Sequence, residues 1–165
     1  MSSRSRSLHH KARIVPLADA RVLASGDTCE RGARQYAALP WRRRGGGTVQ
    51  VLLITSRETR RWVIPKGWAM HELSPGEAAA QEAYEEAGVF GDASAQPIGA
   101  YVYDKRLRDG EVRAVEVLVF PMEVLVEKLT FPEQGQRDKR WFDLAAAAEL
   151  VDEPGLQALI DAFEP

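Results

Sequence analysis

The sequence predicts an α/β fold of the α+β type, in which a mixed β-sheet is sandwiched between helices. Three observations support this: the middle of the chain is rich in strand-like segments, one clearly bounded helix interrupts them, and the C-terminal segment has helical patterns. Helices and strands do not alternate regularly, as they would in a βαβ array. The chain has 165 residues, 45% of them hydrophobic, which suits one domain with a substantial core.

Residues 1–32 are expected to form an N-terminal tail, partly disordered or extended, before a single domain at 33–165. The tail opens with the run SSRSRS and shows no sustained hydrophobic periodicity, and His9 and His10 are expected to be solvated in it. An organelle-targeting peptide is the alternative. Its amphipathic pattern would be interrupted by one proline and three acidic residues, Pro16, Asp19, Asp27 and Glu30.

The charges are distributed unevenly, although the formal net charge is only −2. Basic residues outnumber acidic ones over residues 1–61, and the reverse holds over residues 62–165. This asymmetry suits a polyanionic substrate and bound cations, but a charged tail joined to solvated helices gives the same pattern. The single cysteine, Cys29, cannot form an internal disulfide, which favours the cytoplasm. No apolar run approaches the roughly 18 residues that span a bilayer, so no membrane segment is expected.

Strands are expected from residue 34 onward. Residues 35–41 and 49–55 are apolar with aromatic or β-branched side chains, which is typical of strands. The basic, glycine-rich stretch 42–47 between them predicts a flexible hairpin loop. Residues 62–64, just before Pro65, predict another short strand.

The segment that follows has the sequence signals of a helix at both ends. Ser74 suits the N-cap, Pro75 the first helical position and Glu77 the third, which together make a capping box. Gly88 supplies the left-handed residue that ends a helix. A helix over Pro75–Ala87 is therefore expected.

Further strands and two C-terminal helices complete the expected domain. Residues 96–105 and 112–124 have strand patterns and are joined across Asp109-Gly110, a strong hairpin signal. Residues 139–143 predict a last strand. The remaining segments predict helices at 144–151 and 154–163.

The predicted helix over Pro75–Ala87 carries three carboxylates on one face. At about 100° per residue, Glu82, Glu85 and Glu86 fall within an arc of about 100°. The opposite side carries the residues that should face a core, namely Ala80, Ala83, Tyr84 and Ala87. Three like charges at this spacing repel one another, and a divalent cation would remove that repulsion. A glutamate-rich outer face is also common on surface helices, so spacing alone does not establish a metal site.

The segment Gly67–Val89 resembles the Nudix box, in which a glycine is followed at fixed spacing by glutamates and a closing glycine. The matching residues are Gly67, Glu82, Glu85, Glu86, Gly88 and Val89. The preceding Ser56-Arg57 and Pro65-Lys66-Gly67 make the arrangement similar to the diphosphoinositol-polyphosphate and diadenosine-polyphosphate hydrolase branch. The resemblance covers residues 34–150 and implies a Nudix-type mixed sheet between helices.

The resemblance also implies an activity: hydrolysis of a phosphoanhydride bond in a nucleoside-diphosphate-linked or polyphosphorylated substrate, with diadenosine or diphosphoinositol polyphosphates expected first. It implies Mg²⁺ or Mn²⁺ held by Glu82, Glu85 and Glu86. The catalytic base would be Glu82 or, second, Glu133 from a downstream loop. The expected substrate-binding residues are Arg34, Ser56, Arg57, Lys66 and Gly67.

Two positions depart from the family pattern. Gln81 replaces the arginine that orients a catalytic glutamate in the family, and it can donate hydrogen bonds but no charged fork. Leu73 replaces an early glutamate, for which Glu72 or Glu77 is a partial substitute off the family position. With the three metal-binding glutamates kept, altered rather than lost activity is expected.

Two other functions remain open. The first is removal of pyrophosphate from RNA 5′ ends, although no RNA-binding module is recognisable, so nucleic acid is not the expected partner. The second is a weakly active or non-catalytic nucleotide-sensing module, which the substitutions at Gln81 and Leu73 suggest. The expected partner is a small anionic phosphate substrate, with the choice between monomer and homodimer left open. Three tryptophans could stack on a base but more often belong to a core, namely Trp62, Trp68 and Trp141.

Overall fold

The computed structural model describes residues 33–107 and 109–165, so the expected tail, with His9, His10 and Cys29, lies outside the described residues. The described chain contains eight strands and three helices. In chain order they are β1 (Ala33–Arg43), β2 (Val49–Thr55), β3 (Trp62–Val63), β4 (Lys66–Trp68), α1 (Pro75–Ala87), β5 (Val89–Ala93), β6 (Gly99–Arg106), β7 (Val112–Glu127), β8 (Lys139–Asp143), α2 (Leu144–Leu150) and α3 (Pro154–Asp161).

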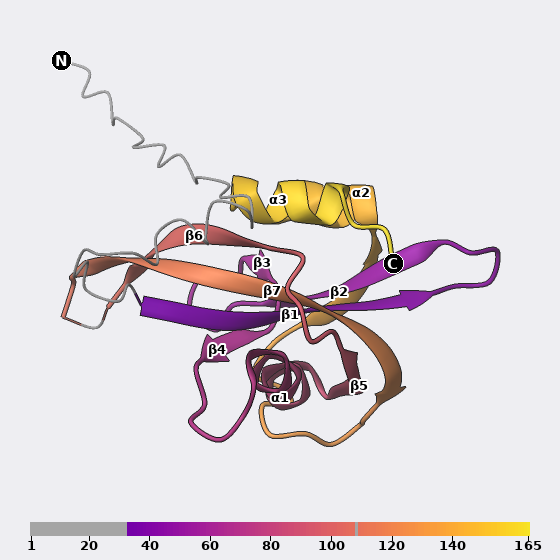
Figure 1. The fold of residues 1–165 in the computed structure, drawn as a ribbon, viewed down its shortest axis with the longest axis horizontal. Coiled ribbons are helices and arrows are strands. Elements are labelled where there is room, and N and C mark those ends of the chain that lie inside the picture. Colours follow the sequence, from indigo (N-terminus) through magenta and orange to yellow (C-terminus); the bar gives the residue numbers. More distant parts are fainter. Residues whose placement is uncertain (1–32, 108) are drawn as a thin grey trace, which may run out of the picture.

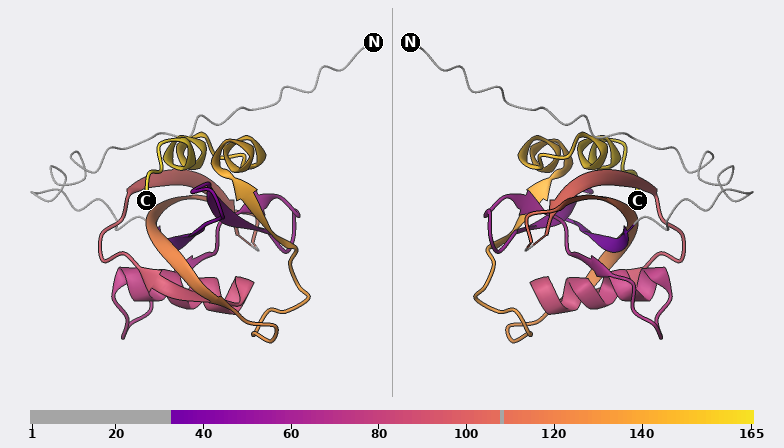
Figure 2. Two further views of the ribbon diagram at one scale, coloured as in Figure 1. Left: turned by 90° about the vertical axis from the view of Figure 1, so that its right-hand side faces the viewer. Right: turned by 90° about the vertical axis from the view of Figure 1, so that its left-hand side faces the viewer.

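The strands form one mixed sheet, and the helices cover it from both sides. The central path runs β3-β2-β1-β7-β5, with β4 paired to β1, β6 to β7 and β8 to β2. The pairing of β1 with β7 is parallel, from Ala33↔Val115 to Trp41↔Glu123, and the other named pairs are antiparallel. Helix α1 lies on one side of the sheet and α2 and α3 on the other (Figures 1 and 2). The expected α+β sandwich is confirmed.

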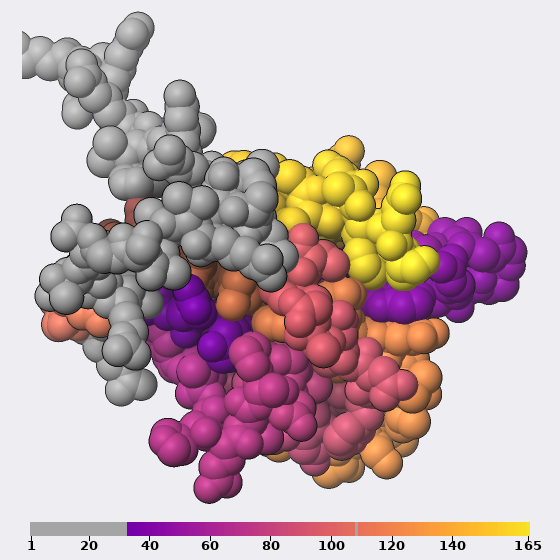
Figure 3. All heavy atoms as spheres, viewed as in Figure 1, coloured from indigo at the N-terminus to yellow at the C-terminus, as the bar shows by residue number. Residues whose placement is uncertain are grey.

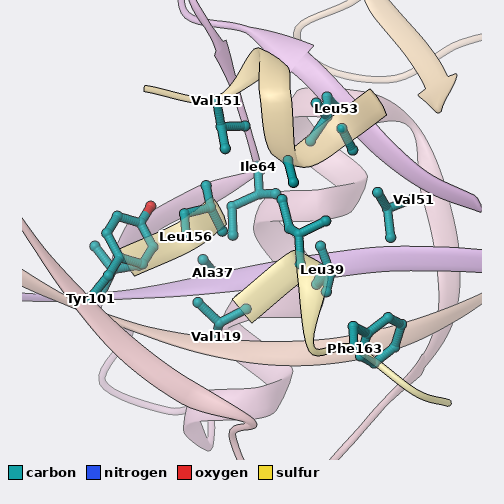
Figure 4. Packing of buried hydrophobic residues seen from close by; sticks show 14 of the residues in the cluster. Ala37, Leu39, Val51, Leu53, Ile64, Tyr101, Val119, Val151, Leu156 and Phe163 are labelled. Atoms are coloured by element: carbon teal, nitrogen blue, oxygen red, sulfur yellow. The ribbon is translucent and has the colours of Figure 1, made fainter. Parts of the chain in front are cut away.

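Two apolar layers form because the central strands are buried on both faces. Successive residues of β1 and β2 point to opposite sides: Leu39 and Leu53 belong to the layer under α2 and α3, while Ala38 and Leu52 belong to the layer under α1. Figure 4 shows the first layer, where Leu156 of α3 packs among side chains from the sheet. The sheet is therefore the central layer of the fold, with helices packed on both of its faces.

Helix α1 begins and ends where the sequence predicts. The Ser74 hydroxyl accepts a hydrogen bond from the backbone N–H of Glu77, and the Glu77 carboxylate accepts one from the backbone N–H of Ser74. Gly88 adopts a left-handed conformation with φ 69°, and its N–H bonds the last turn. The helix buries a stripe of small residues against the sheet, Gly76, Ala78, Ala79, Ala83 and Ala87.

Several boundaries differ from the expectations. Arg42 and Arg43 extend β1 by pairing with β2, so the hairpin turn is shorter than the predicted loop; Arg44 N–H bonds the Thr48 carbonyl at 2.8 Å. This hairpin projects from the side of the molecule (Figure 3). Strands β4 and β5 were not predicted, β6 begins at Gly99 rather than residue 96, and β7 continues to Glu127. No helix within 33–107 or 109–165 is long and apolar enough to cross a membrane.

Candidate functional site

Gly67 of β4 and Glu82 of α1 lie in direct contact. A Cβ added to Gly67 would come within 1.8 Å of a Glu82 carboxylate oxygen, so any side chain there would displace that carboxylate. The close approach is possible because α1 packs through alanines, which keep the helix axis near the sheet. Gly67, which the sequence placed among the substrate-binding residues, therefore lies against the first of the predicted metal-binding carboxylates.

Glu82 lies among other carboxylates. Burial and the negative charges of Glu86, Glu85 and Glu133 together raise the pKa of Glu82 to about 7, and Arg137 offsets only part of this. A carboxylate with a pKa near neutrality can accept a proton at physiological pH. The structure thus brings both predicted catalytic residues, Glu82 and Glu133, next to the predicted metal ligands.

Glu86 is held on both of its oxygens. One accepts a hydrogen bond from the backbone N–H of Lys66 at 3.1 Å, and the other accepts one from the Arg137 guanidinium. Only 11% of its side chain is exposed. Burial raises the pKa of Glu86, while the charges of Arg137 and Lys66 lower it. The helical wheel had placed this carboxylate toward solvent; it is instead covered, because the 131–138 segment folds over it.

Glu85 and Glu133 meet where that segment crosses α1. Gln81 donates to the Glu85 carboxylate at 2.6 Å, and the Glu133 N–H donates to the Glu85 carbonyl at 3.0 Å. Gln81 therefore still donates a hydrogen bond within the box, but to Glu85 alone. Glu77, the suggested substitute for the early box glutamate, is occupied instead by the helix cap at Ser74.

Lys66 lies half-buried beside this cluster. Desolvation lowers the pKa of Lys66, and the nearby charges of Glu86 and Glu153 partly offset that effect. Its ammonium lies 5.7 Å from the centroid of the Tyr103 ring. A desolvated cation next to the carboxylates is suited to contact a phosphate oxygen.

The other predicted substrate-binding residues take different positions. Arg57 reaches the site, since its guanidinium lies 3.4 Å from the Glu133 carboxylate while 58% of its side chain stays exposed. Ser56 lies in the turn after β2 and shares a 2.6 Å hydrogen bond with the Thr59 hydroxyl. Arg34 of β1 pairs with Glu116 of β7 at 2.7 Å and has no described contact with the carboxylate cluster.

The three tryptophans also differ. Trp62 packs edge-on against Phe142 in the core, with ring centroids 5.1 Å apart. Trp141 lies partly buried under the guanidinium of Arg42, 4.1 Å from its ring centroid. Trp68 is 44% exposed, and the Lys105 ammonium lies 4.6 Å from the centroid of its ring. Trp68 is therefore the most accessible of the three for stacking.

The donor set suits a hard divalent cation in kind, because carboxylate oxygens are the ligands such cations prefer. The negative charges of Glu85, Glu86 and Glu133 each raise the pKa of Glu82, so these three carboxylates lie close enough to interact with it. Among the described residues, no three Asp, Glu, His or Cys side chains already converge around one point. Glu85 and Glu86 are instead turned toward Gln81 and Arg137.

Comparison with known proteins identifies the family. The profile of the NUDIX domain matches residues 33–163, nearly the whole described chain. This chain belongs to the Nudix family. A Nudix relative, Nudix hydrolase 13, mitochondrial, of Arabidopsis thaliana, is 34% identical over 122 residues, covering 70% of this chain but 59% of its own length. This chain thus spans less than two thirds of that relative. Because its name says mitochondrial, the cytoplasmic location of this Nudix protein stays a prediction.

This chain is also similar to part of another relative and to a solved structure. Diphosphoinositol polyphosphate phosphohydrolase 2 of Rattus norvegicus is 51% identical over 43 residues, covering 26% of this chain and 24% of that protein. A crystal structure of C. elegans Ap4A hydrolase superimposes with a TM-score of 0.57 at 16% identity, covering 79% of this chain and 94% of the other. The second likeness establishes the Nudix fold.

One residue of the site was missed at the sequence level. Arg137 contacts both Glu86 and Glu133, yet no local pattern marks it, because its partners lie in α1 and in the preceding turn. The available signal was the i, i+4 spacing of Glu133 and Arg137. That spacing points to an ion pair only if the segment between them turns back on itself.

Proposed function

We propose that this protein is a divalent-metal-dependent pyrophosphohydrolase that cleaves a phosphoanhydride bond in a nucleoside-diphosphate-linked or polyphosphorylated substrate. The observation that carries this proposal is the group of four glutamates beside β4, where Gly67 contacts Glu82, the Lys66 N–H bonds Glu86, and nearby carboxylates help to raise the pKa of Glu82 to about 7. Concentrated carboxylates in a half-buried site are costly unless a cation or proton compensates them. Membership of the Nudix family supports this activity.

In this proposal Glu82, Glu85 and Glu86 hold Mg²⁺ or Mn²⁺, whose positive charge would polarise the anhydride. Glu82 would accept the proton of the attacking water, and Glu133 is the second candidate for that role. The water attacks one phosphorus in line, and the bond to the bridging oxygen breaks. The Lys66 ammonium and the exposed Arg57 guanidinium stabilise the negative charge that develops on the phosphate oxygens.

The substrates proposed first are diadenosine and diphosphoinositol polyphosphates. Both carry a phosphoanhydride bond among several negatively charged phosphates, which Lys66 and Arg57 can contact. Trp68 supports the dinucleotide as substrate, because it is exposed on β4 and an aromatic base can stack on an indole. Arg34 and Ser56 remain proposed substrate contacts that would have to leave their present partners.

A panel assay tests the proposal. Metal-depleted protein is given Mg²⁺ or Mn²⁺ and then diadenosine polyphosphates, diphosphoinositol polyphosphates or 5′-triphosphorylated RNA, and released phosphate and nucleotide are measured. Turnover that requires the added metal is expected, with a chelator-treated sample as the control. Tight nucleotide binding without turnover of any compound would overturn the proposal and point to a sensing module.

A further inference from the structure

Arg137 is a nearly buried guanidinium, with 8% of its side chain exposed, that joins three parts of the chain. Its Nε donates to Glu133 at 2.7 Å, its Nη1 to the Thr55 carbonyl at 3.1 Å, and its Nη2 to the Glu86 carboxylate. These partners lie in the turn before it, at the end of β2 and in α1. The planar fork of arginine is suited to satisfy partners in three directions at once.

Other contacts attach the turn to α1 without orienting its carboxylate. The Glu133 N–H bonds the Glu85 carbonyl, and the Phe131 ring fills the space beside Gly88. These contacts hold the backbone of the turn together with Arg137, whose bonds to the Thr55 carbonyl and to Glu86 reach β2 and α1. The Glu133 carboxylate itself is oriented by Arg137 at 2.7 Å and, more weakly, by the exposed Arg57 at 3.4 Å.

We propose that Arg137 is the positioning residue of this site. By binding both Glu133 and Glu86, it holds the Glu133 carboxylate at a fixed distance from the carboxylate of Glu86, and so sets the geometry of the groups that act in hydrolysis. The inference rests on the proposed hydrolytic function. Gln81 cannot do this, because it reaches only Glu85 and carries no charge. A carboxylate has about four lone-pair positions, so Glu86 and Glu133 keep free acceptor sites while Arg137 holds them.

The kinetic test compares Arg137→Ala and Arg137→Lys with Arg60→Ala. Arg60 is a matched control in contact with the same segment, since it bonds the Gln136 carbonyl and pairs with Asp138 but touches none of the four glutamates. Loss of two charge-assisted hydrogen bonds should lower kcat of Arg137→Ala by roughly 10–100-fold. The KM should stay within about threefold, because a positioning residue acts on the reacting geometry and not on substrate binding.

Rescue separates positioning from simple charge balance. Arg137→Lys keeps the positive charge but not the fork, so its kcat should remain low. Free guanidinium ion at a non-denaturing concentration should partly restore Arg137→Ala and leave Arg60→Ala unchanged. A wild-type kcat in Arg137→Lys would overturn the proposal, and this variant also decides the matter if Arg137→Ala does not fold.

A second readout does not depend on turnover. Amide hydrogen exchange in residues 131–134, which Arg60 does not contact, should be faster in the Arg137 variants than in wild type, and unchanged in Arg60→Ala. Exchange equal to wild type in every folded Arg137 variant would overturn the proposal. If wild type hydrolyses no compound of the panel, the proposed function fails, while the exchange measurement still decides whether Arg137 holds the turn.

Discussion

The two helical layers on the sheet are built from different side chains. Helix α1 contacts the sheet through glycine and alanines, is capped by reciprocal hydrogen bonds, and brings Glu82 and Glu86 against β4. Helices α2 and α3 have no side-chain hydrogen bond at their N-caps, and α3 inserts the large apolar residues Leu156 and Ile160 into the core. One layer brings charged groups close to the sheet, and the other supplies apolar burial.

This contrast shows how a small domain can place costly charges in a half-buried site. Small residues under α1 contribute little apolar area each, so this helix depends more on its caps. The α2–α3 layer contributes the larger share of burial per residue and contains none of the four glutamates of the site. Changes in the α1 layer should therefore affect chemistry first, and changes in the α2–α3 layer should affect stability first.

The largest expected effect is loss of activity on changing Glu86 to Gln. The variant keeps the size of the side chain but removes the charge that a cation requires, so kcat/KM should fall by about 1,000-fold, or about 4 kcal/mol. Steady-state hydrolysis of the best panel substrate measures this. Glu149→Gln, an exposed change on α2, is the control and should leave the rate unaltered. A Glu86→Gln rate near that of wild type would remove the metal-ligand assignment.

The next effect is a loss of stability on changing Leu156 to Ala in α3. Leu156 is fully buried among residues of the sheet, so its truncation should lower the free energy of unfolding by about 3 kcal/mol. Urea denaturation measures it, and kcat at a temperature where the variant is folded should stay within about twofold. Leu129→Ala is the control, since Leu129 is 90% exposed and its change should cost little. A large drop in kcat of folded Leu156→Ala would show that the two layers are not separable.

A smaller effect concerns pH. The fold raises the pKa of Glu82 to about 7, so Glu82 is protonated more readily in the folded protein than in the unfolded chain. The stability this contributes is present below the ordinary carboxyl pKa and is lost as pH rises through about 7. With metal removed, Glu82→Gln should therefore be more stable than wild type above that pH, by about 1 kcal/mol after solvent screening. Thermal melting from pH 5 to 8 checks this, and equal slopes for both proteins would contradict it.

The smallest effect is on the cap of α1. Ser74→Ala removes the hydroxyl that accepts from Glu77 and should lower the free energy of unfolding by about 1 kcal/mol. Ser74→Asp, which restores an acceptor, is the matched control and should recover most of the loss. Chemical denaturation of the three proteins is the measurement. If alanine and aspartate variants are equally stable, the cap contributes nothing measurable.

The sequence predicted those elements whose signals are local. Helix α1 has its cap, its first proline and its terminal glycine within the chain itself, and the apolar run of β2 allows only a buried strand. Strands β4 and β5 were missed because the segments KGW and VFGDA are short and contain glycine. They are strands only because β1 and β7 supply hydrogen-bonding partners.

The residues of the site also divide into those with local sequence signals and those that depend on distant partners. Glu82, Glu85 and Glu86 are recognisable from their spacing and resemblance, and Glu133 was named as a candidate. The roles of these residues stay predictions. The role of Arg137 depends on a turn whose packing no local pattern reveals, and the pairing of Arg34 with Glu116 depends on the parallel ladder of β1 with β7. Both contacts join residues that are far apart in the chain, so local sequence patterns could not predict them.

That parallel ladder has a consequence for how the protein folds during synthesis. Arg34 and Glu116, neighbours across the ladder, are 82 residues apart in the chain. The centre of the sheet cannot close until β7 has left the ribosome, and contacts of such long range form slowly. Until then the apolar run VLLIT of β2 has no completed sheet to cover it, so it is open to aggregation in the nascent chain.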